Sequence, residues 1–294
     1  MRIIKPNVEL IDIATPGKKM EYAGRICYLS RDRITDDSYV KFISAIVKSG
    51  HCSILEHERI IVEIDTKKGG DPLLTISQKN HMKYFNINNC DNGIMYISAN
   101  IRGWFDAIDD DEIIYDNGIY SLLKSVYPYI FKKELEKKQE VDCKIVNVKE
   151  LPEEIRKFHD SKTFDIVCSR ACSHQLVRHR TLTFSQQSQR YVNFSKDKFG
   201  HSINFIMPET VDETFEKLLL DYFKKEEENY FSLIEKGLKP EDARSVLPNA
   251  TATQIVITGT TSDWESFIKL RSDSHAQKEI RDISDTIKNY LKIS

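Results

Sequence analysis

Three arginines and a histidine lie close together in a stretch with hardly a carboxylate nearby. The stretch reads QLVRHRTLTFSQQSQRYV, residues 175–192, and it contains Arg178, His179, Arg180 and Arg190. A solvated basic helix would carry Glu and Asp at helical spacing, whereas hydroxyl and amide side chains surround these arginines. Arginine presents planar donors at a fixed positive charge, which suits a phosphate or a negatively charged heterocycle. The stretch is therefore predicted to bind an anion.

A second polar segment, LRSDSHAQ at residues 270–277, contains Arg271 and His275. Their i, i+4 spacing predicts that both project from one face of the last helix. Later in this helix an apolar stripe of Ile280, Ile283, Ile287 and Leu291 indicates that it is packed, so a polar segment on it is a candidate site.

A metal site is not predicted. Cys168, Cys172 and His174 could be imagined as ligands, but no fourth ligand lies nearby, and the two cysteines are better explained as core thiols. The six cysteines also lack C-x-x-C spacing, so reduced thiols are expected.

Composition makes the basic cluster a local feature. The chain has 294 residues, 40% of them hydrophobic, and 43 Lys and Arg against 45 Asp and Glu give a net charge of −2. This balance argues against a general nucleic-acid-binding surface. Charges and Pro6 interrupt the first apolar run, so neither a signal peptide nor a membrane span is predicted, and a cytoplasmic location is expected.

Hydrophobic periodicity predicts an α+β fold, with a mixed sheet packed by long helices. The order of elements is neither a regular βαβ alternation nor all of one type. Helices are predicted at 36–49, 170 to about 180, 211–237 and 239–248, with a last helix after Gly259 that has capping-box spacing from Ser262 to Glu265; strands are predicted at 58–65, 163–169, 201–209 and 253–259.

Residues 66–161 differ in character from the rest and are predicted to form a lobe inserted into a single domain spanning residues 1–294. A breaker cluster opens this region, an acidic run lies at 109–112, and a solvated charged helix is predicted at 132–140. Within it, MYISANIRGWFDAI at 95–108 is similar to IVITGTTSDWESFI at 255–268, and each reads as a strand leading into a Trp-containing helix.

Several blocks together resemble the flavin-dependent thymidylate synthases, the ThyX family. RHRTLTFSQQS at 178–188 is similar to the family signature, and GHCSILEH at 50–57, ARSVLP at 243–248 and LRSDSHAQKEI at 270–280 are similar to its other blocks, in the same order. The resemblance covers roughly residues 20–65 and 160–290. It implies methylation of dUMP to dTMP with methylenetetrahydrofolate, FAD as redox carrier and NADPH as reductant. It also implies a homotetramer with its sites between subunits, and neither nucleic acid nor membrane as partner.

The resemblance also implies roles for individual residues. Arg271 would be catalytic, a cation beside the uracil ring that favours the ring anion without a protein nucleophile. His51 and His275 match family histidines near the flavin. Contacts to FAD are implied for Ser53, Arg178, His179, Arg180, Gln186, Ser266 and His275. Contacts to dUMP are implied for Gln175, Leu176, Val177, Arg178, Gln186, Gln187, Ser188, Gln189, Arg190, Arg244 and Arg271.

The chain departs from the family at one flavin-binding block. Where the family commonly has Asn-x-Arg and a later Asn, this chain has Thr260, Ser262 and Ser266, whereas Asn100 and Arg102 stand at the similar junction in the lobe. These two residues could replace the missing contacts, or Asn100 could cap a helix and Arg102 could be a surface charge. For the whole chain, the alternative to an enzyme is a non-catalytic nucleotide- or RNA-binding protein that uses the same arginines.

Overall fold

A computed structural model describes the chain except for residues 68–83, 91, 110–116, 134–141, 197–199 and 294. The predicted α+β class is confirmed, but the expected mixed sheet is wrong. Both four-stranded sheets are antiparallel throughout, and the parallel pairing among the described strands is the two-stranded ribbon of β1 (Arg2–Ile4) and β9 (Asn204–Ile206). Antiparallel neighbours need no helical crossover, which agrees with the irregular order of strands and helices.

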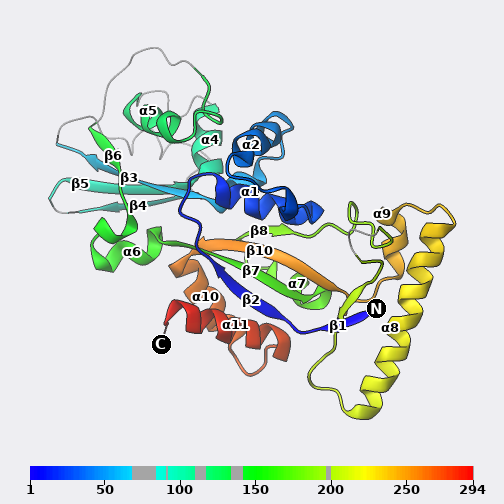
Figure 1. Cartoon of the computed structure of the whole chain (residues 1–294). Coiled ribbons are helices and arrows are strands. Elements are labelled where there is room, and N and C mark those ends of the chain that lie inside the picture. Colours follow the sequence, from blue (N-terminus) through cyan, green and yellow to red (C-terminus); the bar gives the residue numbers. More distant parts are fainter. Residues whose placement is uncertain (68–83, 91, 110–116, 134–141, 197–199, 294) are drawn as a thin grey trace.

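The sheet that carries the predicted site has the strand order β2-β7-β10-β8 (Figure 1). Its strands are β2 (Asn7–Ile11), β7 (Ser161–Ser169), β10 (Ala252–Thr260) and β8 (Thr183–Gln186). Alternate residues such as Phe164, Ile166 and Ile257 pack with α10 (Thr261–Arg271) and α11 (Lys278–Leu291) in one core. The opposite face carries the buried polar residues Thr163, Asp165 and Thr258 together with Val256, and it meets the N-terminal helices, where Val256 packs against Ala23 and Ile26.

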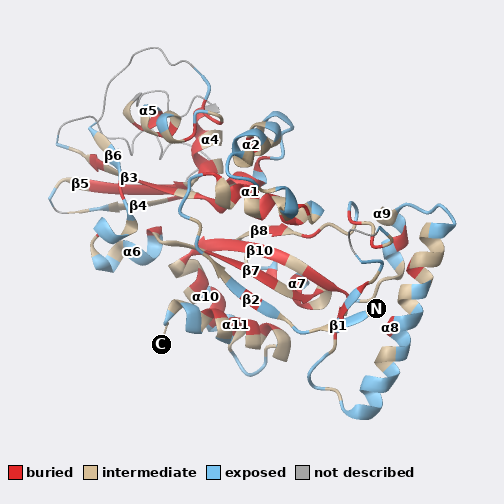
Figure 2. Ribbon diagram, in the orientation of Figure 1, coloured by how far each residue is buried: buried red, intermediate tan, exposed pale blue. Residues whose placement is uncertain are grey.

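A second sheet has the strand order β4-β5-β3-β6. Its strands are β4 (Phe85–Asn89), β5 (Ile94–Asn100), β3 (Arg59–Asp65) and β6 (Cys143–Ile145). Trp104 of α4 (Ile101–Asp109) and Leu123 of α5 (Asn117–Val126) are fully buried in its core. Because β3 lies before residue 66, this sheet extends beyond the predicted lobe. Figure 2 shows buried residues along the central strands of each sheet, so the chain has two main cores.

The helices predicted at 36–49, 170 to about 180, 211–237 and 239–248 are present with shifted ends, whereas the helices at 18–25, 117–126 and 153–159 were not predicted. α7 stops at Leu176, earlier than predicted, and the segment predicted at 239–248 forms α9 followed by a 3-10 turn. The acidic run at 109–112 and the charged helix at 132–140 lie almost wholly outside the described residues. The remaining helices are α1 (Lys18–Arg25), α2 (Ser38–Lys48), α6 (Glu153–His159), α7 (Arg170–Leu176), α8 (Glu213–Glu235) and α9 (Pro240–Ala243), and the 3-10 helix η3 is Cys52–His57.

The predicted last helix is two helices, and this corrects two expectations. α10 ends at Arg271, and the Asp273 carboxylate accepts hydrogen bonds from both the backbone N–H and the ring of His275 in the turn before α11. Arg271 and His275 therefore do not share a helix face. The start of α10 is capped by Thr260 with Asp263, and not by Ser262 with Glu265.

Candidate functional site

Helix α7 and the turn after it present the first arginines to solvent. The Ser169 hydroxyl caps α7 by accepting a hydrogen bond from the Cys172 N–H at 3.0 Å. Cys172 and Leu176 are fully buried and anchor the helix against β7 and β10. Arg178 and Arg180 follow the helix and are exposed, and no carboxylate of the described residues lies within ion-pair distance of either. The side chain of Leu176 is thus part of the core, and this residue could contact a ligand only through its backbone atoms.

Arg271 is fixed to this turn by two hydrogen bonds. Its Nε donates to Nε2 of His179 at 2.9 Å, and its Nη2 donates to the carbonyl oxygen of Gln175 at 3.2 Å. Partial burial, helped by the neighbouring Arg271 charge, lowers the pKa of His179 to about 4, so its ring is neutral at pH 7 and can accept. The fold thus brings Arg271 to Gln175 and His179, which lie 96 and 92 positions before it in the sequence.

A second group of cations forms around Glu241. Its carboxylate accepts a hydrogen bond from Nε of Arg190 at 2.8 Å, and its carbonyl accepts one from Nε of Arg244 at 2.9 Å. Arg170, which the sequence analysis missed, belongs to this group, because burial and then the charge of Arg244 lower its pKa. Two cations that disfavour each other's charge form a good binding place for an anion. The sequence feature that could have identified Arg170 is its position at the start of α7, the helix that leads into the arginine stretch.

Strand β8 and the residues after it hold the amide side chains of the cluster. Nε2 of Gln186 donates to the Ser173 hydroxyl at 2.9 Å and to the Thr253 hydroxyl at 3.1 Å. Gln187 is buried, and its N–H donates to the Gln254 carbonyl at 2.8 Å. Ser188 accepts a hydrogen bond from the Arg190 N–H at 3.2 Å, a local contact with no base beside it. Gln186 and Gln187 are therefore held to the sheet.

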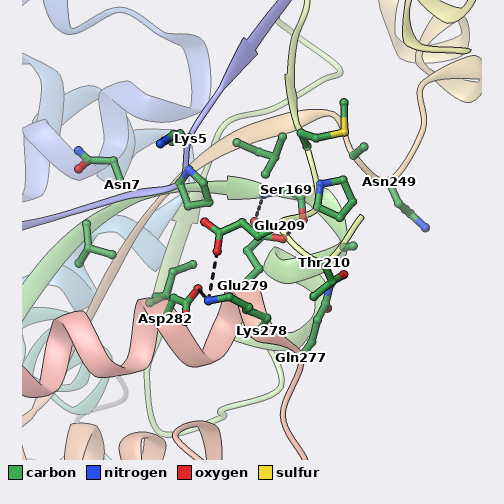
Figure 3. Close-up of a pocket in the computed structure, with 18 of the residues that line it drawn as sticks. Lys5, Asn7, Ser169, Glu209, Thr210, Asn249, Gln277, Lys278, Glu279 and Asp282 are labelled. Atoms are coloured by element: carbon green, nitrogen blue, oxygen red, sulfur yellow. Dashed lines mark hydrogen bonds and ion pairs between the residues drawn. The ribbon is translucent and has the colours of Figure 1, made fainter. Parts of the chain in front are cut away.

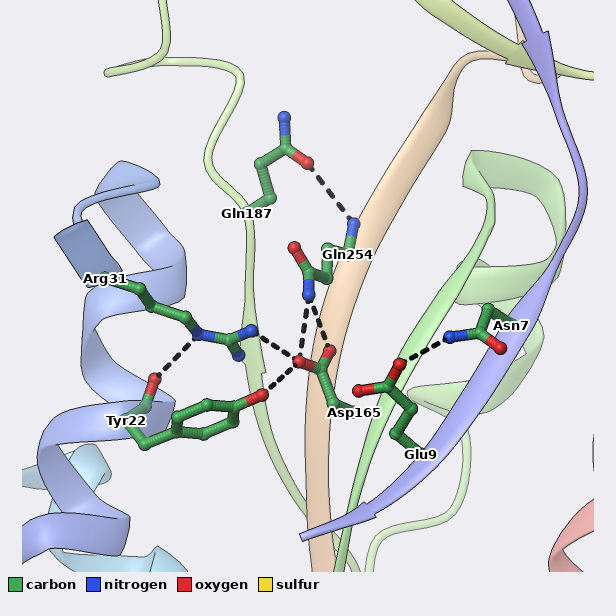
Figure 4. A network of polar contacts seen from close by, with 7 residues as sticks. All are labelled: Asn7, Glu9, Tyr22, Arg31, Asp165, Gln187 and Gln254. Carbon is green, nitrogen blue, oxygen red and sulfur yellow. Dashed lines mark hydrogen bonds and ion pairs between the residues drawn. The ribbon is translucent and has the colours of Figure 1, made fainter.

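A buried carboxylate lies behind these residues (Figure 4). Asp165 on β7 accepts hydrogen bonds from the Gln254 amide at 2.9 Å and from the Tyr22 hydroxyl at 2.7 Å, and it forms an ion pair with Arg31. Burial and the bond to Asp165 raise the pKa of Tyr22. Gln254 also bonds Gln187, so the network connects the N-terminal helices to the nucleotide half of the predicted site.

The 3-10 helix η3 lies between Arg102 and the arginine stretch. Glu56 on η3 accepts a hydrogen bond from the Thr183 hydroxyl of β8 at 3.1 Å. Partial burial lowers the pKa of Arg102, but the carboxylates of Asp106 and Glu56 raise it, and the net shift is upward. Glu56 therefore interacts with Arg102 as well as with Thr183 of the arginine stretch. Ser53 and His51 are exposed at the start of this helix.

Asn100 and Arg102 make the local contacts that the simpler of the two hypotheses expects. The Asn100 side chain accepts a hydrogen bond from the Gly103 N–H at 2.7 Å and caps α4, and Nε of Arg102 donates to Asp106 at 2.6 Å. The contacts of Ser266 and His275 are local too, since Ser266 bonds the Ser262 carbonyl and His275 bonds Asp273. Whether any of these four residues meets a flavin remains a prediction.

A cavity of about 440 Å³ lies beside this cluster and contains none of the predicted site residues (Figure 3). Lys278 bridges Glu209 and Asp282 across it, and Glu279 accepts hydrogen bonds from the N–H and the hydroxyl of Ser169. Arg178, Arg180, Arg190 and Arg244 thus lie outside this cavity, and all four are exposed.

Within the described part of the chain, no group of three or more His, Cys, Asp or Glu side chains is placed to hold a metal ion. None of the helices in that part is long and apolar enough to cross a membrane.

Comparison with known proteins matches the half of the chain that carries this geometry. Residues 158–293 match the family model described as thymidylate synthase complementing protein. This segment is similar to flavin-dependent thymidylate synthases. Proteins of that name from Thermococcus onnurineus, Geobacter sulfurreducens and Saccharolobus solfataricus are 39, 42 and 38% identical to it over 133, 126 and 127 residues. The predicted resemblance to the ThyX family is thereby confirmed for this segment.

The match leaves the first half of the chain uncovered. The aligned part is 43% of this chain and 52% of the Thermococcus onnurineus protein, and 42% and 53% for the Geobacter sulfurreducens protein. The chain therefore spans about half the length of the relatives it matches. The block at 50–57, which suggested the family within the first half, lies outside the matched residues.

Proposed function

We propose that this protein is an FAD-dependent thymidylate synthase. The overall reaction converts dUMP, methylenetetrahydrofolate, NADPH and a proton to dTMP, tetrahydrofolate and NADP⁺. The observation that supports it best is the attachment of Arg271 to His179 and Gln175, because a guanidinium from α10 is held against the signature stretch. The relatives of the matched segment are named for this activity.

The residues present fit a flavin dinucleotide in chemistry. Arg178 and Arg180 are exposed cations that the described carboxylates do not neutralise, and they suit a diphosphate. Gln186 can bond a polar ring edge or a ribose, and exposed Ser53 on η3 lies close to the same strand. When bound, FAD would carry reducing equivalents from NADPH to the transferred carbon.

We assign dUMP to the two cation groups around the arginine stretch. Arg190 and Arg244, with Arg170 beside them, would hold the phosphate and displace the Glu241 contact. Arg271 would meet N3 and a carbonyl of the uracil ring and favour its anion, which raises electron density at C5. No side chain is assigned as a nucleophile, since among the described residues the Ser188 hydroxyl has the Arg190 N–H as its hydrogen-bond partner and no base is bonded to it.

The proposal includes a homotetramer with sites between subunits, because the two cation groups lie on an open face. A cytoplasmic location is also part of it. The RNA-binding alternative gains no support, because the relatives are named for the enzyme.

The test of this function is ligand binding by the full-length protein. Purified protein is loaded with FAD and its absorption spectrum is recorded, and dUMP is then titrated by calorimetry. We expect a flavin spectrum and saturable dUMP binding, with UMP as the matched control ligand. A colourless protein that cannot be loaded with FAD and does not bind dUMP would refute the proposal.

A further inference from the structure

The two sheets have the same arrangement of strands. In each, a central strand leads directly into a helix, β5 into α4 and β10 into α10, and the other strands follow in the order β4-β5-β3-β6 and β8-β10-β7-β2. The pairings have the same register. Two residues after His57, Arg59 pairs with Asn100, the last residue of β5; two residues after His159, Ser161 pairs with Thr260, the last residue of β10.

The two strand-to-helix junctions have the same hydrogen bonds. The N–H of Ile101 donates to the Glu58 carbonyl at 2.8 Å, and the N–H of Thr261 donates to the Asp160 carbonyl at 2.8 Å. Each helix is capped by the side chain of the last strand residue, Asn100 in one and Thr260 in the other. Four residues later, Trp104 and Trp264 occupy equivalent positions, and both are fully buried. The similar sequences at 95–108 and 255–268 therefore lie in equivalent structures.

Two buried histidines connect the sheets reciprocally. His57, two residues before the start of β3, contacts the hydroxyls of Thr258 on β10 and Ser185 on β8, each at 2.8 Å. His159, in the same position before β7, contacts Ser98 on β5 at 2.8 Å and Asn88 on β4 at 2.9 Å.

The hydrogen-bond partners of the two rings are equivalent as well. Thr258 and Ser98 each lie two residues before the end of the central strand. Ser185 pairs with Val256, and Asn88 pairs with Tyr96, each four residues before that end. Reciprocal contact of equivalent residues is the signature of a two-fold interface.

We propose that the chain is a fused pair of two copies of one structural unit, related by an approximate two-fold axis, in which His57 positions the strands of the arginine-bearing site. The first unit is built on β3, β4, β5 and α4, and the second on β7, β8, β10 and α10. The arginine stretch is present in the second unit, and each unit inserts its histidine into the sheet of the other. The role of His57 rests on the function proposed above.

The two histidines have equivalent structural positions, but only the ring of His57 has hydrogen-bond partners in the unit that carries the arginine stretch. The hydrogen-bond partners of His57 lie in the second unit, where Ser185 immediately precedes Gln186 and Thr258 lies two residues before the cap of α10, the helix that ends at Arg271. The hydrogen-bond partners of His159 lie in the first unit, away from the arginine stretch. His57 is thus a positioning residue for the site, and His159 is its matched internal control.

The experiment compares His57→Ala with His159→Ala in the full-length protein, and His57→Gln, which keeps one polar group, serves if His57→Ala does not fold. Urea midpoints report stability, and titration calorimetry well below the unfolding transition reports dUMP and FAD affinity. We expect similar losses of stability from the two alanine variants, because each removes two equivalent buried contacts. We also expect roughly tenfold weaker dUMP binding for the His57 variant and a change of less than about twofold for the His159 variant.

Two results would overturn the proposal. Equal dUMP affinities for the two variants would show that His57 does not position the site. An experimental structure in which the two units cannot be superimposed by a rotation near 180° would exclude the fused pair. If the unmodified protein binds neither FAD nor dUMP, the proposed function fails, and the superposition still decides the duplication.

Discussion

At the scale of single residues, Arg271 carries the chemistry of the proposed site. Its guanidinium uses two of its nitrogens to bind the signature stretch, through His179 and the Gln175 carbonyl. A guanidinium can hold these contacts and still present donors to a ligand, because its five N–H groups lie in one plane. A lysine at this position has one nitrogen and cannot do both.

Replacing Arg271 with lysine should therefore leave the fold intact and reduce turnover by roughly 100-fold or more, the size of effect seen when one donor to a developing anion is lost. Lys269→Ala on the same helix is the control, because Lys269 is exposed. Steady-state formation of dTMP and thermal unfolding are measured for both. Near-parental turnover of the Arg271→Lys variant would remove the assigned role.

Asp165 tests the network behind the site. Replacing it with alanine leaves Arg31 and Tyr22 without their carboxylate, and we expect the free energy of unfolding to fall by about 3 kcal/mol. The control is Asp36→Ala, which removes a fully exposed carboxylate from its ion pair with Lys18 and should change stability by less than about 1 kcal/mol. Urea unfolding measures both. Equal effects of the two substitutions would mean that the Asp165 network does not stabilise the fold.

At the scale of elements, local patterns predicted long elements such as α8 and β10, but they missed short strands such as β2, β6 and β8 and did not place the junctions. The periodicity of α8 and the alternation of β10 are properties of a few consecutive residues, so the sequence is enough to find them. The break after Arg271 depends on the Asp273 side chain bonding the backbone of the turn, and two capping boxes two residues apart competed for the start of α10. Pattern alone does not decide either case.

The candidate site shows the same division. Its basic stretch was visible in the sequence, and the polar segment around Arg271 was a candidate there. The attachment of Arg271 to His179, the pairing of Arg190 with Glu241 and the proximity of Arg170 to Arg244 depend on contacts between distant segments. The sequence contains no local signal for such contacts.

A prediction about flavin binding concerns Arg102, at the junction between β5 and α4. Arg102 interacts electrostatically with Glu56, which bonds Thr183 in the arginine stretch, so we expect Arg102→Ala to weaken FAD binding. Asp106→Ala is the matched control, because it removes the same ion pair and keeps the arginine. FAD affinity and circular dichroism are measured for both variants. If FAD binds the folded Arg102→Ala variant as tightly as the parent, the junction does not contribute to the flavin site.

At the scale of the whole molecule, the buried histidines that join the two units predict how stability depends on pH. Burial lowers the pKa of His57 to about 3 and that of His159 to about 4 from an ordinary 6.5. Below pH 6.5 these two histidines are therefore protonated in the unfolded chain but stay neutral in the folded chain. The free energy of unfolding falls as the pH decreases towards 4. Each histidine contributes a slope of up to about 1.4 kcal/mol per pH unit.

Urea unfolding between pH 7.5 and pH 4, in steps of roughly half a unit, measures this slope. Because carboxylates also titrate in part of this range, the comparison is between the parent and His159→Gln. The difference in unfolding free energy between them should shrink as the pH falls below 6.5. Parallel curves would show that His159 does not stay neutral in the folded protein.

The central claim is that the whole chain makes dTMP, and product formation tests it most directly. The full-length protein is incubated with FAD, dUMP, NADPH and methylenetetrahydrofolate labelled in its methylene carbon, and the nucleotides are analysed by mass spectrometry. We predict labelled dTMP in amounts equal to the NADPH consumed, with no product when FAD or dUMP is omitted. Protein that binds FAD and dUMP under these conditions but forms no dTMP would contradict the account.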